Sequence, residues 1–160
     1  MGVSARVFTF FENPRSVFGV PVRSLMSPKE RIQAMKARGV DDVFMVHFTK
    51  ELASVSPARF AQALKRDYGA RVVVAGEDYT FGRGARGDVC ALAQLGSRFG
   101  FRVIVAPTVR IAAQSGTEAG KISSSAIRAA LDLGRPDLAS ALMKGNAVSD
   151  EDARILAENV

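Results

Sequence analysis

The sequence predicts an α/β fold of the Rossmann-like kind, with a parallel sheet covered by helices on both faces. Short, almost continuously apolar segments alternate with longer segments of helical periodicity, which is typical of a parallel sheet buried on both sides. Capping residues precede the helical segments and glycines follow most of them. Sheets of this type bind ligands at the carboxyl ends of their strands, so the loops after the strands are the first place to look for function.

Four short segments have the apolar, β-branched or aromatic composition of buried strands: Val7–Phe11, Val43–His47, Arg71–Ala75 and Arg102–Ala106. Small and polar residues dominate Ala113–Gly120, so we expect a mobile loop there. The strands therefore lie mainly in the first two thirds of the chain.

Helix starts are marked by residues whose side chains can accept hydrogen bonds from free backbone N–H groups. Ser27 and Glu30 have the spacing of a capping box, with Pro28 at the first helical position. Similar signals begin five further helices, at Ser56-Pro57, Asp88, Ser123, Pro136-Asp137 and Ser149-Asp150. We expect one domain over residues 1–146, followed by a helical tail over residues 147–160.

Composition limits the classes of partner. The net charge is +6, but the basic residues are spread along the chain without interleaved aromatic residues, so we expect an anionic small molecule and no nucleic acid. No apolar run approaches the roughly 18 residues of a membrane span, and we expect no secretory signal. Cys90 is the one cysteine and cannot form an internal disulfide. We expect it to be a buried, inert thiol in a cytoplasmic protein with no membrane partner.

Three serines and an arginine stand at the start of the fourth of these helices. Ser123, Ser124 and Ser125 lie where free N–H groups and the helix dipole favour an anion. Arg128 follows Ser124 by one helical turn, so its guanidinium can bind the same phosphate. The alternative is an ordinary serine-capped helix with a surface arginine.

A glycine-rich loop, Gly76–Gly87, follows the third predicted strand. Its glycines allow close approach of a ligand to the main chain, and Tyr79 and Phe81 can line a pocket for a flat ring. Asp78 can accept hydrogen bonds from a polar edge of that ring. The alternative is a long surface loop. It is not a Walker loop, because no Gly-Lys-Ser/Thr follows the glycines.

In combination these strings resemble the FMN adenylyltransferase module of the bacterial bifunctional riboflavin kinase/FAD synthetases. Val7–Arg15 resembles a strand and its T-F-x-P-H-P-R turn, Gly76–Gly82 resembles the flavin-side G-x-[ND]-F-x-F-G motif, and Ile122–Arg128 resembles the nucleotidyltransferase signature I-S-S-T-x-I-R, with Ser125 in place of threonine. Gly134–Ala139 is similar to the family's following G-D-x-x-x-A stretch. The resemblance covers about Gly2 to Gly145, with the motifs in the family's order.

The resemblance implies transfer of AMP from ATP to FMN, giving FAD and pyrophosphate, with Mg²⁺ on the ATP phosphates. It implies that the ATP phosphates are bound by Ser123, Ser124, Ser125 and Arg128, and that the flavin substrate faces Asp78, Tyr79, Phe81, Gly82 and Asn13. No metal ligand is predicted within the chain. Other adenylyltransferases, for phosphopantetheine or nicotinate mononucleotide, are disfavoured by the flavin-side string.

The chain departs from the family before Val7, where the family has a first βα unit with a G-x-F-D-G-x-H-x-G-H segment. Those histidines polarise the ATP phosphates in the family, so no catalytic residue is predicted here, and we expect weak or no FAD synthesis from the chain as written. His47 stands elsewhere in the order, and we expect it to be a strand-end or core histidine. An upstream segment or a partner chain can supply the missing unit. The alternative is a non-catalytic remnant that binds flavin or nucleotide.

Overall fold

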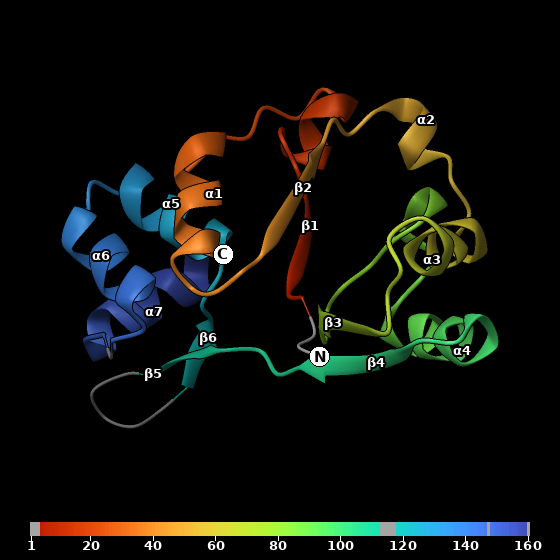
Figure 1. Cartoon of the computed structure of the whole chain (residues 1–160). Helices are drawn as coiled ribbons and strands as arrows, with labels where there is room; N and C mark the ends of the chain where they lie inside the picture. Colours follow the sequence, from red (N-terminus) through yellow and green to blue (C-terminus); the bar gives the residue numbers. More distant parts are fainter. Residues whose placement is uncertain (1–3, 113–117, 147, 160) are drawn as a thin grey trace. The chain divides into compact units, whose positions relative to one another are not determined.

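The computed structural model describes residues 4–112, 118–146 and 148–159 and has the predicted α/β class with parallel strands (Figure 1). The chain forms two compact units. Unit 1 comprises Met1–Ala70 and Thr80–Gly100, and unit 2 comprises Arg71–Tyr79 and Phe101–Val160. The Gly76–Gly87 loop therefore contributes its first part to unit 2 and its second part to unit 1.

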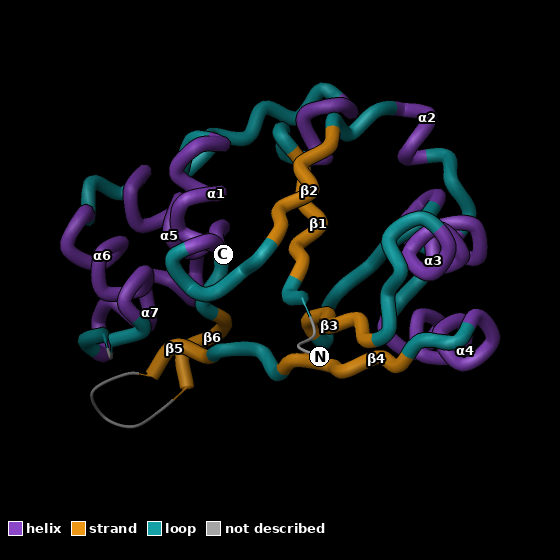
Figure 2. Tube along the Cα trace, viewed as in Figure 1, coloured by secondary structure: helices purple, strands orange, loops and turns teal. Residues whose placement is uncertain are grey.

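Unit 1 is built on two parallel strands, β1 (Arg6–Phe10) and β2 (Asp42–Val46), which run alongside each other in Figure 2. Arg6 lies opposite Asp42, and their side chains form an ion pair at 3.2 Å. The strands carry aromatic rings that pack edge to face, with Phe8 5.4 Å from Tyr68. Both predicted strands are confirmed to within one residue at each end.

The helical elements of unit 1 are η1 (Pro14–Phe18), α1 (Pro28–Lys36), α2 (Lys50–Ala53), α3 (Pro57–Arg66), η2 (Arg83–Ala85) and α4 (Val89–Phe99). The helices α3 and α4 lie side by side and bury Ala61 and Leu92, each with no exposed surface (Figure 1). Apolar contact between these helices forms the core of this unit.

The predicted capping box at the start of α1 is confirmed. The Ser27 N–H donates to Glu30 Oε2 at 2.7 Å, and the Glu30 N–H donates to Ser27 Oγ at 3.3 Å. Two backbone donors that the helix cannot satisfy internally are thereby paired.

Replacing Ser27 with alanine should lower the free energy of unfolding by about 1 kcal/mol, because the Glu30 amide loses its acceptor. Urea denaturation of the wild type and of Ser27→Ala measures this difference. Ser27→Asp is the matched control, since aspartate also caps and should retain most of the stability. An unchanged free energy of unfolding in Ser27→Ala would show that the cap does not stabilise this helix.

Unit 2 contains two pairs of strands. β3 (Val72–Gly76) and β4 (Arg102–Ala106) are parallel, as predicted, whereas β5 (Arg110–Ala112) and β6 (Glu118–Lys121) form an antiparallel pair. The prediction of a loop over Ala113–Gly120 was wrong for residues 118–120, which lie in β6. Residues 113–117 of that prediction lie outside the described residues.

Three helices complete unit 2: α5 (Ser124–Asp132), α6 (Pro136–Lys144) and α7 (Asp150–Asn159). They gather in one group next to the β5–β6 pair (Figure 1). Their buried side chains form one cluster with the strands, composed of Ile111, Ala126, Ala130, Leu138, Ala139, Leu142, Val148, Ala153 and Leu156. This core holds α5, the helix whose start carries the three serines.

Two expectations about burial were wrong. Cys90 is exposed, because it lies two residues before the buried Leu92 and hence on the opposite side of α4. Val72 and Val74 of β3 are 41% and 64% exposed. An apolar run predicts a strand, but it does not establish that both faces of the strand are covered.

None of the helices in the described part of the chain combines the length and the apolar composition that a membrane span requires.

Candidate functional site

The predicted phosphate-binding segment forms a regular helix start. Ser123 is the N-cap residue of α5, and its hydroxyl oxygen accepts a hydrogen bond from the Ala126 N–H at 3.1 Å. Ser124 and Ser125 occupy the first turn and are exposed. Their amides belong to the first turn of a helix, where N–H groups have no partner within the helix and point toward an incoming anion.

The position of this helix start is fixed on both sides. After it, Ala126 and Ala130 are buried in the core of unit 2, with exposed fractions of 1% and 0%. Before it, the Ile122 N–H donates to the Val109 carbonyl at 2.9 Å. Arg128 is half-buried and one turn beyond Ser124 on the same helix. The segment is therefore held rigidly enough to present its first turn in one orientation.

Asp78 and Lys121 form an ion pair within unit 2. Asp78 belongs to the glycine-rich loop after β3, and Lys121 ends β6, two residues before Ser123. This contact connects the flavin-side string of the sequence with the phosphate-binding string, although the paired residues are 43 positions apart. The sequence identified both strings, but no local signal in either of them paired Asp78 with Lys121.

The hydrogen bond and positive charge of Lys121 lower the pKa of the Asp78 carboxyl group. Replacing Lys121 with methionine should therefore raise the pKa of Asp78 toward its ordinary value. Because the pKa is lower in the folded chain, the pair stabilises the fold at neutral pH, and this contribution is lost as the pH falls through the folded pKa. A side-chain NMR titration of Asp78 measures the shift. Lys144→Met, at the exposed end of α6, is the control and should leave it unchanged.

The carboxyl end of β3 carries a tight turn that places Asp78 and Tyr79. The Tyr79 N–H donates to the Gly76 carbonyl at 3.0 Å, and the Glu77 side chain accepts from the Thr108 N–H at 3.2 Å. Tyr79 is 36% exposed, and partial burial raises the pKa of its hydroxyl group. Asp78 and Tyr79, two of the predicted flavin-side residues, thus lie immediately after a parallel strand, where sheets of this class bind ligands.

The second part of the loop, in unit 1, is anchored by Phe81. This ring is only 6% exposed and lies 5.4 Å from the Phe60 ring of α3. Phe81 and Gly87 also exchange two backbone hydrogen bonds of 2.9 Å each. Gly82 follows and packs against Pro57 so closely that an added Cβ atom would lie 2.7 Å from the proline ring. Phe81 and Gly82 therefore shape the loop, and their predicted contact with flavin stays a prediction.

Polar residues also gather at the carboxyl ends of β1 and β2 in unit 1. Asn13 is the N-cap of η1, and its Oδ1 accepts from the Arg15 N–H at 3.0 Å. His47 follows β2 directly, which confirms the prediction of a strand-end histidine. Its ring stacks on Phe11 with centroids 4.5 Å apart, and its Nδ1 lies 2.7 Å from Glu12 Oε1.

This Glu12–His47 pair was not predicted from the sequence. Hydrogen bonding to His47 lowers the pKa of the Glu12 carboxyl group. A signal was available, because each residue directly follows an apolar segment, and parallel neighbours bring such positions together. Within the described ranges, no group of three or more His, Cys, Asp or Glu side chains is arranged to hold a metal ion.

Comparison with known proteins identifies the family. A family model described as FAD synthetase matches residues 1–126. The chain belongs to the FAD synthetase family. The match includes both the Gly76–Gly82 string and the start of α5, so it confirms the resemblance inferred from those motifs.

Similar FAD synthetase relatives are longer than this chain. The bifunctional riboflavin kinase/FMN adenylyltransferase of Bacillus subtilis (strain 168) is 29% identical over 146 residues, which cover 89% of this chain and 44% of the relative. The protein of the same name from Escherichia coli (strain K12) is 29% identical over 130 residues, covering 78% of this chain and 39% of the relative. The chain thus spans less than half the length of these relatives.

A solved structure shares the fold of this FAD synthetase family member. It is described as a macrolide-efflux protein from Streptococcus pneumoniae, and it matches with a TM-score of 0.69 and 30% sequence identity. The match covers 83% of this chain and 43% of that chain. This likeness agrees with the α/β fold class of the chain.

Proposed function

We propose that this chain binds ATP and FMN and transfers AMP from ATP to FMN, giving FAD and pyrophosphate. The observation that carries the proposal is the Asp78–Lys121 ion pair, which joins the loop after β3 to the strand that leads into α5. The first of these segments has the flavin-side motif and the second has the phosphate-binding motif. The similar relatives from Bacillus subtilis and Escherichia coli are named as FMN adenylyltransferases, which supports the same reaction.

On the ATP side, the amides and hydroxyls at the start of α5 would bind the phosphates, together with Arg128. The hydroxyl oxygen of Ser123 already accepts a hydrogen bond as the helix cap. Ser123 would therefore contribute to phosphate binding mainly by positioning the helix start. Ser124 and Ser125 keep exposed side chains for direct contact. Mg²⁺ would enter with ATP, and it would neutralise phosphate charge. Its oxygen preference fits the phosphates and the serine hydroxyls at this helix start.

On the flavin side, Tyr79 offers a partly exposed ring for stacking, and Asp78 offers a carboxylate acceptor for ring N–H groups. Phe81 and Gly82 would fix the course of the loop that contacts the flavin substrate. Asn13, at the end of β1, is a further proposed substrate contact.

In the proposed reaction, a phosphate oxygen of FMN attacks the α-phosphorus of ATP. A new P–O bond forms, the bond between the α-phosphorus and the bridging oxygen breaks, and pyrophosphate leaves with that oxygen. The residues at the start of α5 would orient the triphosphate and neutralise the charge that develops on the leaving group. Positioning and charge neutralisation are the main contributions a protein makes to phosphoryl-type transfer.

Residues 1–146 would act as one adenylyltransferase module, with residues 147–160 as its helical tail, packed on the core through Leu156. An upstream segment or a partner chain would supply the βα unit with the family's histidines. A cytosolic location fits the FAD synthetase reaction, whose proposed substrates are phosphorylated metabolites.

The test is to incubate the purified chain with FMN and Mg-ATP and to separate the products by chromatography. FAD and pyrophosphate in equal amounts would support the proposal, even at low turnover. Saturable binding of both substrates with no pyrophosphate release would instead support the alternative, a non-catalytic binding protein. If neither ATP nor FMN binds, the proposed function is wrong.

A further inference from the structure

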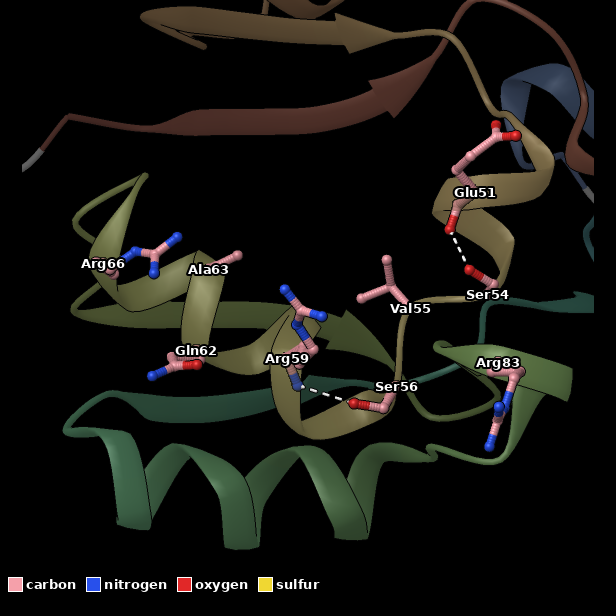
Figure 3. A pocket seen from close by; sticks show the side chains of 9 residues that line it. All are labelled: Glu51, Ser54, Val55, Ser56, Arg59, Gln62, Ala63, Arg66 and Arg83. Carbon is pink, nitrogen blue, oxygen red and sulfur yellow. Dashed lines mark hydrogen bonds between the residues drawn. The ribbon is translucent and has the colours of Figure 1, made fainter.

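Unit 1 contains a cavity of about 510 Å³ to which none of the predicted ATP- or flavin-binding residues contributes (Figure 3). It lies between the short helix α2, the start and one face of α3, and the turn η2. Its lining residues are Glu51, Ser54, Val55, Ser56, Arg59, Gln62, Ala63, Arg66 and Arg83. Three of these side chains are guanidinium groups and only one is a carboxylate, so the lining is strongly basic.

Two of the three arginines have no acidic partner among the described residues. Arg66 is paired with Asp67 at 2.7 Å. In contrast, neither Arg59 nor Arg83 pairs with an acidic side chain in the part of the chain that the structure describes. Positive groups that share a cavity without a protein counter-ion are stabilised by an anionic ligand.

The single carboxylate of the cavity offsets only part of this charge, and it stays ionised. Glu51 lies in the first turn of α2, where its own backbone amide and the Thr49 hydroxyl stabilise its charge. The Ser54 hydroxyl proton is not available to a ligand, because it is donated to the Glu51 carbonyl at 2.7 Å (Figure 3). Ser56 accepts from the Arg59 N–H at 3.3 Å, which leaves its hydroxyl proton available to donate to a ligand.

The arginine on the loop side is held in place by the backbone. The Arg83 N–H donates to the Val55 carbonyl at 2.7 Å. The preceding Gly82 is packed against Pro57, and Phe81 is packed against Phe60, so the loop is fixed to the start of α3 on both its backbone and its side-chain side. Figure 3 shows Arg59 on α3 and Arg83 on this loop, on either side of Ser56. The two guanidinium groups thus belong to separate elements, α3 and the loop at η2, which a hydrogen bond and packing contacts hold together.

We propose that this cavity binds a phosphate group, with the guanidinium groups of Arg59 and Arg83 and the Ser56 hydroxyl as its donors. Guanidinium groups match phosphate oxygens in geometry and charge, and they remain protonated at any physiological pH. Arg83 belongs to the same loop as the flavin-side motif. The assignment of the phosphate to a substrate therefore rests on the proposed function, and it can belong to FMN or to ATP.

The test begins with inorganic phosphate as the probe, titrated into the full chain and followed by NMR at the backbone amides beside the cavity, those of Ser56 and Arg83. The double variant Arg59→Ala/Arg83→Ala should weaken phosphate binding by about tenfold or more, because two charge-assisted contacts are lost. The matched control is Arg38→Ala/Arg98→Ala, which removes the same charge outside the cavity and should change the affinity by less than about twofold. Circular dichroism establishes that both variants are folded. Equal affinities of the wild type and the cavity variant would overturn the proposal.

The second arm identifies the source of the phosphate by comparing FMN with riboflavin and ATP with adenosine. If the cavity holds the FMN phosphate, the wild type should prefer FMN over riboflavin, and the cavity variant should lose that preference while binding riboflavin as before. Loss of the preference for ATP over adenosine would assign the cavity to ATP. If both preferences persist in the cavity variant, the assignment to a substrate is wrong. If the wild type binds none of the four molecules, the proposed function fails, and the phosphate titration still decides the cavity.

Discussion

Replacing Gly82 with alanine should lower the free energy of unfolding by about 2–5 kcal/mol, combining backbone strain with overpacking. Gly82 has φ 73° and ψ 178°, a region of backbone conformation that only glycine occupies without strain. The added Cβ atom would also lie 2.7 Å from the ring and 2.8 Å from the backbone nitrogen of Pro57. Neither contact can be relieved by rotating a flexible side chain. Chemical denaturation of the wild type and of Gly82→Ala measures the loss.

Gly84→Ala provides the matched control for this substitution. Gly84 also has a positive φ, of 66°, but the nearest atom to an added Cβ is 3.9 Å away. This variant should lose only the cost of the left-handed backbone, about 1–2 kcal/mol. The difference between the two variants therefore reports the packing of the loop on α3 together with the additional backbone strain at Gly82. Equal losses would contradict the account of how this loop is anchored.

Arg128→Ala should weaken ATP binding by about 1.5–3 kcal/mol, or roughly 10- to 150-fold, if the guanidinium makes a charge-assisted contact with a phosphate. Arg128 lies on α5 one turn after Ser124, on the helix whose start is anchored in the core of unit 2. Isothermal titration calorimetry with Mg-ATP measures the change. Arg98→Ala in α4 removes the same charge far from this motif in the sequence and should have little effect.

Unchanged nucleotide affinity in Arg128→Ala would mean that Ser123–Arg128 is an ordinary capped helix start. Riboflavin affinity provides an internal check in the same variant. It should stay the same, because the predicted flavin-side residues lie on the loop after β3 and at the start of η1, and not on α5. A loss of both affinities would indicate a folding defect and not a lost phosphate contact.

The elements that local chemistry determines could be predicted from the sequence. The capping box of α1, the limits of β4 and the proline-initiated start of α6 all depend on residues within one or two turns of each other. The start of α5 was predictable for the same reason, since Ser123 caps the helix through an amide three residues away.

Features that depend on distant residues could not be predicted. Asp78 pairs with Lys121, and nothing within either segment selects that partner. The strand β6 contains small and polar residues that are typical of loops, so its pairing with β5 comes from tertiary context. The exposure of Val74 was missed because an apolar strand has the same sequence pattern whether or not a neighbour covers it.

Phe81 shows how a correct motif can suggest an incomplete role. The sequence placed this ring in a ligand-binding loop, and an aromatic side chain there favours stacking on flavin. The ring is buried against Phe60, where it fixes the loop that also carries Arg83, and its contact with flavin stays a prediction. A side chain that holds a binding loop has the same sequence pattern as one that contacts the ligand, and only the packing separates the two.

The most direct test of phosphate binding at the start of α5 is an amide NMR titration with Mg-ATP at physiological salt. The largest chemical-shift changes should occur at the amides of Ser124 and Ser125, with smaller changes in α4. They should be saturable and should be lost in Arg128→Ala at the same ATP concentration. Saturable changes confined to other segments, or none at all, would contradict the central claim that this helix start binds the ATP phosphates.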